Sequence, residues 1–62
     1  MTQIHLGHVR YDTVTRAYEA PVTILRDGAI RQIPSRISAP VNANPARVAR
    51  ALTAQALKRF SR

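Results

Sequence analysis

The side chains that could bind a metal or transfer a proton are few in this sequence. His5 and His8 have the H-x-x-H spacing that brings two metal ligands together on a helix. The segment around them, residues 4–9, reads as extended, however, and residues three apart on a strand point to opposite faces. The chain contains no cysteine, and no carboxylate beside the histidines completes a ligand set. We therefore expect solvated or structural histidines, no bound metal and no cofactor.

General acid–base or nucleophilic catalysis has little support in the sequence. Catalysis of this kind needs paired carboxylates, or a histidine with a carboxylate, in a pocket. Asp12 and Asp27 fall in predicted turns, where aspartate commonly bonds the local backbone. The two glycines are far apart, so no glycine-rich loop is available to hold a phosphate. A chain of 62 residues also has little volume for a pocket, and we expect that it is not an enzyme.

All of the net charge lies in the second half of the chain. Residues 1–27 contain three arginines and three carboxylates, whereas residues 28–62 contain no carboxylate and carry the whole formal charge of +7. A positive field of this size attracts polyanions or acidic surfaces over about one Debye length, ~8 Å at physiological salt. The basic residues of this half, which are the candidate nucleic-acid-binding residues, are Arg31, Arg36, Arg47, Arg50, Lys58, Arg59 and Arg62.

Length and composition indicate a single small domain over residues 1–62. Hydrophobic residues make up 45% of the chain, which is enough for a small core and argues against disorder along its whole length. A chain this short buries only ~60% of its unfolded surface, so self-association as a homodimer would add stability. Residues 1–7 lack the basic start and apolar run of a secretion signal. The longest uncharged stretch, residues 37–46, contains two prolines and cannot span a membrane. We expect a cytoplasmic protein with no membrane partner.

Turn-forming residues divide the first half into three predicted strands, near residues 6–11, 17–25 and 29–33. Asp12 with the two threonines after it forms the first turn signal, and Asp27-Gly28 forms the second. Asp-Gly between segments of high β-propensity is a strong hairpin signal. Pro21 lies in the middle predicted strand and cannot donate a ladder hydrogen bond, so either the strand bends there or the sheet is shorter.

The apolar pattern favours one register for the Asp27-Gly28 hairpin. A two-residue loop would place Ile24 opposite Arg31 and mix polar with apolar side chains on one face. A three-residue loop with Gly28 in the left-handed conformation places Ile24 opposite Ile30, and we prefer this register. The predicted inward face is then composed of Tyr18, Ala20, Val22, Ile24 and Ile30.

The strongest local signals predict a loop over residues 34–44 and a helix over residues 45–60. Asn44 is a favoured N-cap, and Pro45 suits the first helical position. At 100° per residue, an apolar stripe forms from Val48, Ala49, Leu52, Ala56 and Phe60, with Leu57 at its border. The opposite side carries Arg47, Arg50, Lys58 and Arg62. The sequence thus predicts an amphipathic helix with a basic outer surface.

Together these elements predict an α+β domain, a three-stranded antiparallel β-meander with one C-terminal helix packed on one face. Through Tyr18–Ile24, Asp27-Gly28 and Ala46–Leu52, the sequence resembles the end of a double-stranded-RNA-binding domain, and the topology also resembles small antitoxins of the HicB type. The resemblance covers residues 18–57. The first helix of the RNA-binding family and its paired lysines have no counterpart, so no functional residue is transferred from either family.

Two functions of different classes fit this sequence. The first is a small basic protein that binds nucleic acid through its arginine-rich helix face. The second is a protein–protein interaction module, or accessory subunit, that docks on an acidic partner or on another copy of itself. A lone helix on a three-stranded sheet leaves one sheet face and two strand edges uncovered, which favours the second function.

Overall fold

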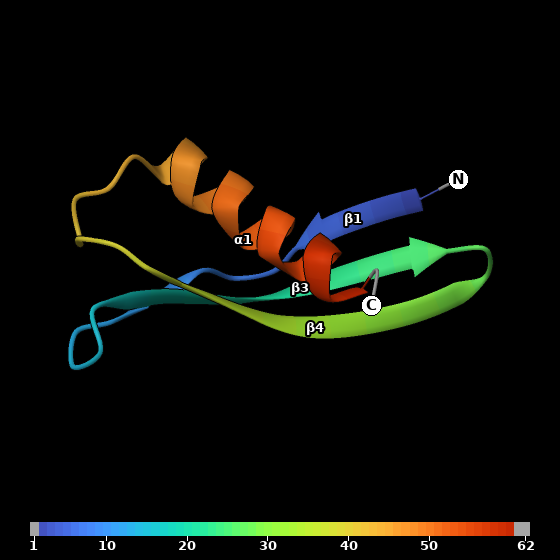
Figure 1. The fold of residues 1–62 in the computed structure, drawn as a ribbon, viewed down its shortest axis with the longest axis horizontal. Helices are drawn as coiled ribbons and strands as arrows, with labels where there is room; N and C mark the ends of the chain where they lie inside the picture. Colours follow the sequence, from blue (N-terminus) through green and yellow to red (C-terminus); the bar gives the residue numbers. More distant parts are fainter. Residues whose placement is uncertain (1, 61–62) are drawn as a thin grey trace.

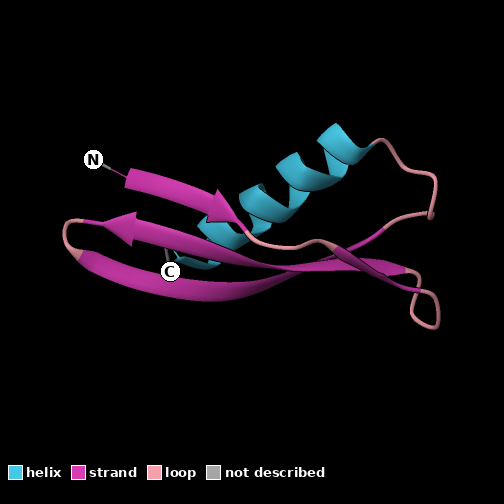
Figure 2. Ribbon diagram, turned by 180° about the vertical axis from the view of Figure 1, so that it is seen from behind, coloured by secondary structure: helices cyan, strands magenta, loops and turns pink. Residues whose placement is uncertain are grey.

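The computed structural model describes residues 2–60. This part of the chain contains four β-strands and one α-helix (Figure 1). The elements are β1 (Thr2–Leu6), β2 (Arg10–Asp12), β3 (Ala17–Arg26), β4 (Ala29–Ser38) and α1 (Pro45–Phe60). The strands form one antiparallel sheet, and α1 lies diagonally across one of its faces (Figures 1 and 2). The predicted α+β architecture is therefore confirmed, with four strands in place of three.

The predicted strand over residues 6–11 is largely wrong: residues 7–9 are not in a strand, and β1 lies almost wholly before the predicted segment and was not predicted. β1 and β2 follow one another along the same edge of β3, and β4 lies along its other edge. The break between them, residues 7–9, lies beside Pro21 of β3. Because Pro21 has no N–H to donate, the neighbouring strand cannot continue the ladder there. Gly7 still donates a hydrogen bond to the Pro21 carbonyl, at 2.8 Å.

The close approach at this break requires glycine at position 7. A Cβ on Gly7 would lie 2.7 Å from Cγ of Pro21 and 3.0 Å from its carbonyl oxygen. β3 itself is continuous from Ala17 to Arg26 and pairs with β4 along its whole length. The proline therefore interrupts the neighbouring strand, whereas the sequence suggested a bent or shortened central strand.

The β3–β4 hairpin has the register that the apolar pattern disfavoured. Arg26 pairs with Ala29 across a two-residue turn, so the predicted three-residue loop is wrong. Asp27 and Gly28 both have positive φ, 51° and 82°. These are the signs required by a type I′ turn, whose twist matches the twist of the flanking strands.

This register changes which side chains lie on the helix side of the sheet. Ile24 is fully buried there, and it pairs with Arg31. The Arg31 side chain is exposed there, and its guanidinium lies 6.0 Å from the centroid of the Phe60 ring at the end of α1, the outer limit of a cation–π interaction. Ile30 lies on the helix-free side with 72% of its surface exposed, so its predicted place on the inward face is wrong.

Replacing Gly28 with valine is expected to lower the free energy of unfolding by about 1–2 kcal/mol, because a β-branched side chain is strained in the left-handed region. Among the described residues, nothing lies within 4 Å of a Cβ built on Gly28, so the destabilisation comes from its backbone conformation, with φ at +82°. Urea unfolding measures the change. Gly28→Asn is the control, since asparagine tolerates this region. Equal stability of the valine variant and the wild type would contradict the turn assignment.

β4 continues past Ile33, its predicted end, to Ser38, and the connecting loop shortens from residues 34–44 to 39–44. Hydrogen-bonded and non-hydrogen-bonded pairs alternate from the turn along an antiparallel ladder. By this alternation Pro34, which is opposite Pro21, directs its nitrogen away from β3. The ladder therefore needs no donor from Pro34, and the strand does not end at the proline.

Two tyrosines hold the loop over residues 39–44 against the sheet. Tyr11 and Tyr18 are paired on β2 and β3, and their ring centroids are 4.6 Å apart. The Tyr18 hydroxyl donates to the Val41 carbonyl at 2.6 Å, and the Tyr11 hydroxyl donates to the Ala39 carbonyl at 3.2 Å. Tyr18 packs against the core, which confirms its predicted inward orientation.

α1 begins and ends at the predicted residues and buries three residues of its predicted apolar stripe, while Ala49 and Phe60 are half-buried. The side chain of Asn44 accepts a hydrogen bond from the Ala46 N–H at 2.9 Å and caps the helix. Val48, Leu52 and Ala56 are almost fully buried against the sheet. These helix residues form two hydrophobic clusters with β3. Val48 and Leu52 pack with Ala20, and Ala56 packs with Val22 and Ile24.

Candidate nucleic-acid interface

Three basic side chains form a stripe along the outer side of α1. Arg47, Arg50 and Lys58 are all exposed, and the helical period places them opposite the buried Leu52. Ala54, also exposed, occupies the remaining position between them. At about 1.5 Å per residue, the three charges extend over roughly 16 Å of the helix. Arg47, Arg50 and Lys58 are called the basic stripe below.

The stripe has no acidic neighbour on its own element. Residues three or four apart on a helix share a face, so an acidic residue at such a spacing would pair with the cations. None of the 16 residues of α1 is acidic. No negative side chain of α1 therefore neutralises the positive charge on the outer side of the helix.

The acidic side chains of the chain lie on other elements. Glu19, on the helix-free face of the sheet, pairs with Arg10 at 3.9 Å and with Arg36 at 3.8 Å. Asp12 accepts hydrogen bonds from the backbone N–H groups of the turn that follows it, and these bonds hold the pKa of its carboxyl below the usual value. Asp27 lies in the β3–β4 turn. Within residues 2–60, no acidic side chain forms an ion pair with the stripe.

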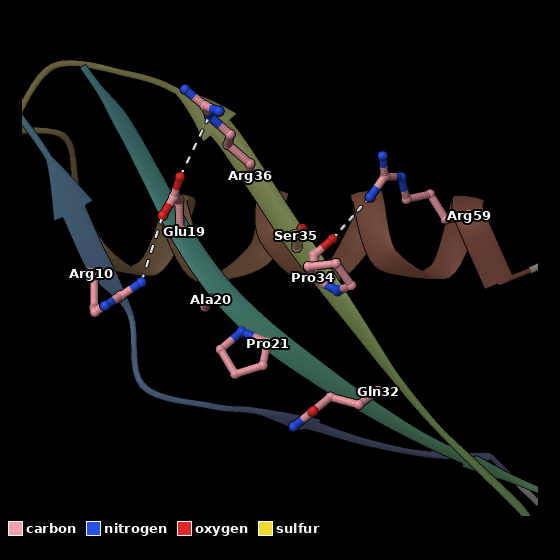
Figure 3. A pocket seen from close by; sticks show the side chains of 9 residues that line it. All are labelled: Arg10, Glu19, Ala20, Pro21, Gln32, Pro34, Ser35, Arg36 and Arg59. Atoms are coloured by element: carbon pink, nitrogen blue, oxygen red, sulfur yellow. Dashed lines mark hydrogen bonds and ion pairs between the residues drawn. The ribbon is translucent and has the colours of Figure 1, made fainter. Parts of the chain in front are cut away.

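Arg59 belongs to the same helix but to a different surface. It follows Leu52 by nearly two helical turns, so its side chain starts from the sheet side of α1. Its guanidinium donates a hydrogen bond to the Pro34 carbonyl of β4 at 3.0 Å (Figure 3). The sequence places Arg59 among the binding residues, and the structure holds it at the edge of the sheet.

Arg31 lies beyond the C-terminal end of the stripe. Its guanidinium and that of Arg26 are each 6.0 Å from the centroid of the Phe60 ring. Cations are favoured at this position because the C-terminal end of a helix carries partial negative charge. Arg26 was not among the predicted binding residues. The two-residue turn would have identified it, since that register places Arg26 and Arg31 on the same side of the sheet.

Arg36 lies on the face of the sheet that α1 does not cover. There it lines a shallow depression of about 630 Å³ (Figure 3). Arg10 and Glu19 line it beside Arg36, and Pro21, Pro34 and the Arg59 side chain of α1 also line the depression. Arg36 and the basic stripe therefore face opposite directions, so they do not form one surface.

Six of the seven predicted binding residues are thus divided among three places: the stripe, the helix end where Arg31 lies, and the depression that Arg36 and Arg59 both line. Arg62, the seventh, lies outside the described residues. His5 and His8 are exposed, and in the part of the chain that the structure describes no three His, Cys, Asp or Glu side chains gather to hold a metal ion. The stripe is the largest group of the predicted residues that the fold brings together.

Comparisons with known proteins add no relative to this picture. Within residues 2–60, no helix has the length and apolar character needed to cross a membrane. No protein family, curated protein or solved structure matches the chain. Its function therefore has to follow from the chemistry of the described surface.

Proposed function

We propose that this protein binds nucleic acid through the basic stripe and acts by association and not by catalysis. The observation that supports the proposal is the exposure of Arg47, Arg50 and Lys58 along one side of a helix that contains no acidic residue. Nucleic acid suits such a surface, because each phosphate that a lysine or arginine neutralises releases condensed counterions. Two of the three stripe residues are arginines, which can bond a phosphate with two N–H groups at once.

The proposed contacts are to phosphates and not to base edges. Arginine and lysine bond phosphates and can also bond guanine, whereas asparagine and glutamine, which read adenine, are absent from the stripe. Gln55, the one glutamine of α1, accepts a hydrogen bond from the Arg36 N–H at 2.7 Å and is held against β4. Because phosphate contacts carry no sequence information, binding should depend little on sequence.

An acidic protein surface is the alternative partner. The same cations would attract the carboxylates of an acidic protein. Loss of affinity at a protein interface is concentrated at one or two residues, and its salt dependence is weaker. Either partner fits a cytoplasmic location, since a chain without cysteine needs no oxidising compartment.

The salt dependence of binding tests the proposal. Fluorescence anisotropy with a labelled DNA duplex and a labelled RNA of equal length gives log K against log salt between about 50 and 200 mM. We expect a slope of about −3 from the stripe alone, and up to about −5 where Arg26 and Arg31 also contact phosphates. No binding to DNA or RNA at the lowest salt would overturn the proposal and leave the acidic protein surface as the partner.

A further inference from the structure

Two of the outer strands, β4 and β1, differ in whether their free edge is blocked. On β4, the Pro34 carbonyl accepts a hydrogen bond from the Arg59 guanidinium at 3.0 Å. The backbone N–H of Arg36 donates to the side-chain oxygen of Gln55 at 2.7 Å. Pro34 also has no N–H to offer to another strand. Prolines, charged residues and covering side chains at a sheet edge prevent pairing with a further strand. The middle of β4 is therefore closed to edge pairing.

β1 forms an edge that lacks these devices. Alternate residues of β3 bond to β4 and to β1, and the β1 residues that bond to β3 are Gln3 and His5. The N–H and C=O groups of Thr2, Ile4 and Leu6 therefore point away from the sheet. Within residues 2–60, β1 pairs with β3 alone, and Figures 1 and 2 show it as an outermost strand.

We propose that β1 pairs in antiparallel fashion with β1 of a second copy of this chain. Placing Ile4 opposite its own counterpart sets Thr2 opposite Leu6. Thr2, Ile4 and Leu6, the residues whose backbone groups point outward, then all fall in hydrogen-bonded pairs. The strand is self-complementary in this register, as a contact across a two-fold axis requires.

The side chains of β1 suit this contact. Ile4 lies on the helix side of the sheet opposite Ile24, yet 41% of its surface is exposed, and pairing would bury it against its counterpart. Leu6, which is half-buried, would meet Thr2 on the same side. On the helix-free side Gln3 would meet His5, and neither carries a fixed charge. No side chain opposes a like charge.

The charge distribution also selects this edge. Two copies of a chain with a formal charge of +7 repel one another, so contact is favoured where the local charge is lowest. Residues 1–9 contain no lysine, arginine, aspartate or glutamate. Among the four strands of the sheet, β1 alone has no charged side chain.

The pairing would join the two sheets into one and place both helices on the same side. A two-fold axis perpendicular to the sheet does not exchange its faces, so α1 of each copy stays on its original side. The two basic stripes would then face one polyanion together, and linked sites of this kind bind more tightly than either alone. Dimer formation itself does not depend on nucleic acid and is measured without it.

Sedimentation velocity of the nuclease-treated protein over a concentration series tests the proposal. We expect a reversible dimer that Ile4→Lys converts to monomer, because the substitution places two charges at the centre of the pairing. Ile30→Lys is the matched control, since Ile30 is a 72%-exposed isoleucine on the opposite outer strand. Circular dichroism shows that each variant is folded. A wild type that stays monomeric, or equal effects of both substitutions, would overturn the proposal.

Disulfide cross-linking tests the register independently. Opposed residues of a hydrogen-bonded antiparallel pair have Cα atoms ~5.5 Å apart, which a disulfide can span. The chain has no cysteine of its own, so single substitutions give a clean readout. We expect a covalent dimer from Ile4→Cys under mild oxidation and none from Ile30→Cys. Failure of Ile4→Cys, or equal cross-linking of both variants, would contradict the register.

Salt separates this proposal from the proposed function. Raising the salt concentration screens the repulsion between two chains of charge +7, so the dimer should become stronger. Binding to nucleic acid should become weaker over the same range. A protein that binds nucleic acid but does not dimerise contradicts the β1 pairing alone. A protein that dimerises but does not bind nucleic acid contradicts the proposed function alone.

Discussion

Changing Arg47, Arg50 and Lys58 together to glutamine is expected to lower affinity for DNA and RNA by up to ~10³-fold at 50 mM salt, about tenfold for each phosphate that is no longer neutralised. All three side chains are exposed and none is part of the buried core, so the fold should persist. The slope of log K against log salt should become less steep by up to about 3. Unrelated sequences should be weakened equally, because phosphate contacts do not read bases. Anisotropy titrations over a salt series measure both quantities.

A second triple variant separates the stripe from the overall charge. Changing Arg10, Arg16 and Arg36 to glutamine removes the same number of charges from positions outside α1, all of them exposed. Two of these side chains pair with Glu19 on the helix-free face. We expect this variant to keep most of the affinity of the wild type. An equal fall in affinity for the two variants would show that net charge, and not the stripe, attracts the nucleic acid.

Local signals in the sequence were sufficient to predict the helix and the position of the β3–β4 turn, but the predicted three-residue length of that turn is wrong. Asn44-Pro45 is a cap followed by a proline at the first helical position, and the helix begins there. Asp27-Gly28 supplies the two residues of positive φ that the hairpin needs. Each of these features is decided by a few neighbouring residues and needs no knowledge of the rest of the fold.

The hairpin register was predicted wrongly because the apolar pattern was given more weight than the two-residue loop that Asp-Gly favours. The sequence argument assumed that Ile24 requires an apolar partner across the strands. In the structure Arg31 takes that place, with its charged group over the Phe60 ring of α1. A contact between residues so far apart in sequence is not visible in the alternation of a single strand.

The interruption of the first predicted strand has a similar origin. Pro21 was recognised as unable to donate a ladder bond, but its effect was assigned to its own strand. The missing donor faces the neighbouring strand, so the break appears at residues 7–9, where Gly7 lies directly against the proline. Only the pairing between strands shows which side of β3 lacks the bond.

The candidate interface was predicted in part. Helical periodicity is sufficient to predict that Arg47, Arg50 and Lys58 share one side, because this placement requires only that residues 45–60 are helical. The position of Arg36 depends on the sheet register, and the position of Arg59 depends on how α1 lies over β4. These two residues were therefore assigned by charge alone, and the fold separates them from the stripe and places both at one depression.

Leu52→Ala is expected to lower the free energy of unfolding by ~2–5 kcal/mol, the range for removing a fully buried leucine. The Leu52 side chain is completely buried, in a cluster with Ala20 of β3 and Val48 of α1. Native domains are stable by roughly 0.05–0.15 kcal/mol per residue, which is ~3–9 kcal/mol for a chain of this length. The substitution should therefore remove much of the stability of the protein. It should lower Tm by about 4–8 °C per kcal/mol.

Matched variants show whether the destabilisation comes from packing of the helix on the sheet. Leu25→Ala makes the same chemical change at a half-buried position on the helix-free face and should cost less. Leu52→Met nearly conserves side-chain volume and should cost under ~1.5 kcal/mol, which keeps the comparison measurable if the alanine variant is largely unfolded. Urea and thermal unfolding give the three values. Equal, small effects of Leu52→Ala and Leu25→Ala would mean that α1 does not pack on the sheet, and the basic stripe would then have no fixed platform.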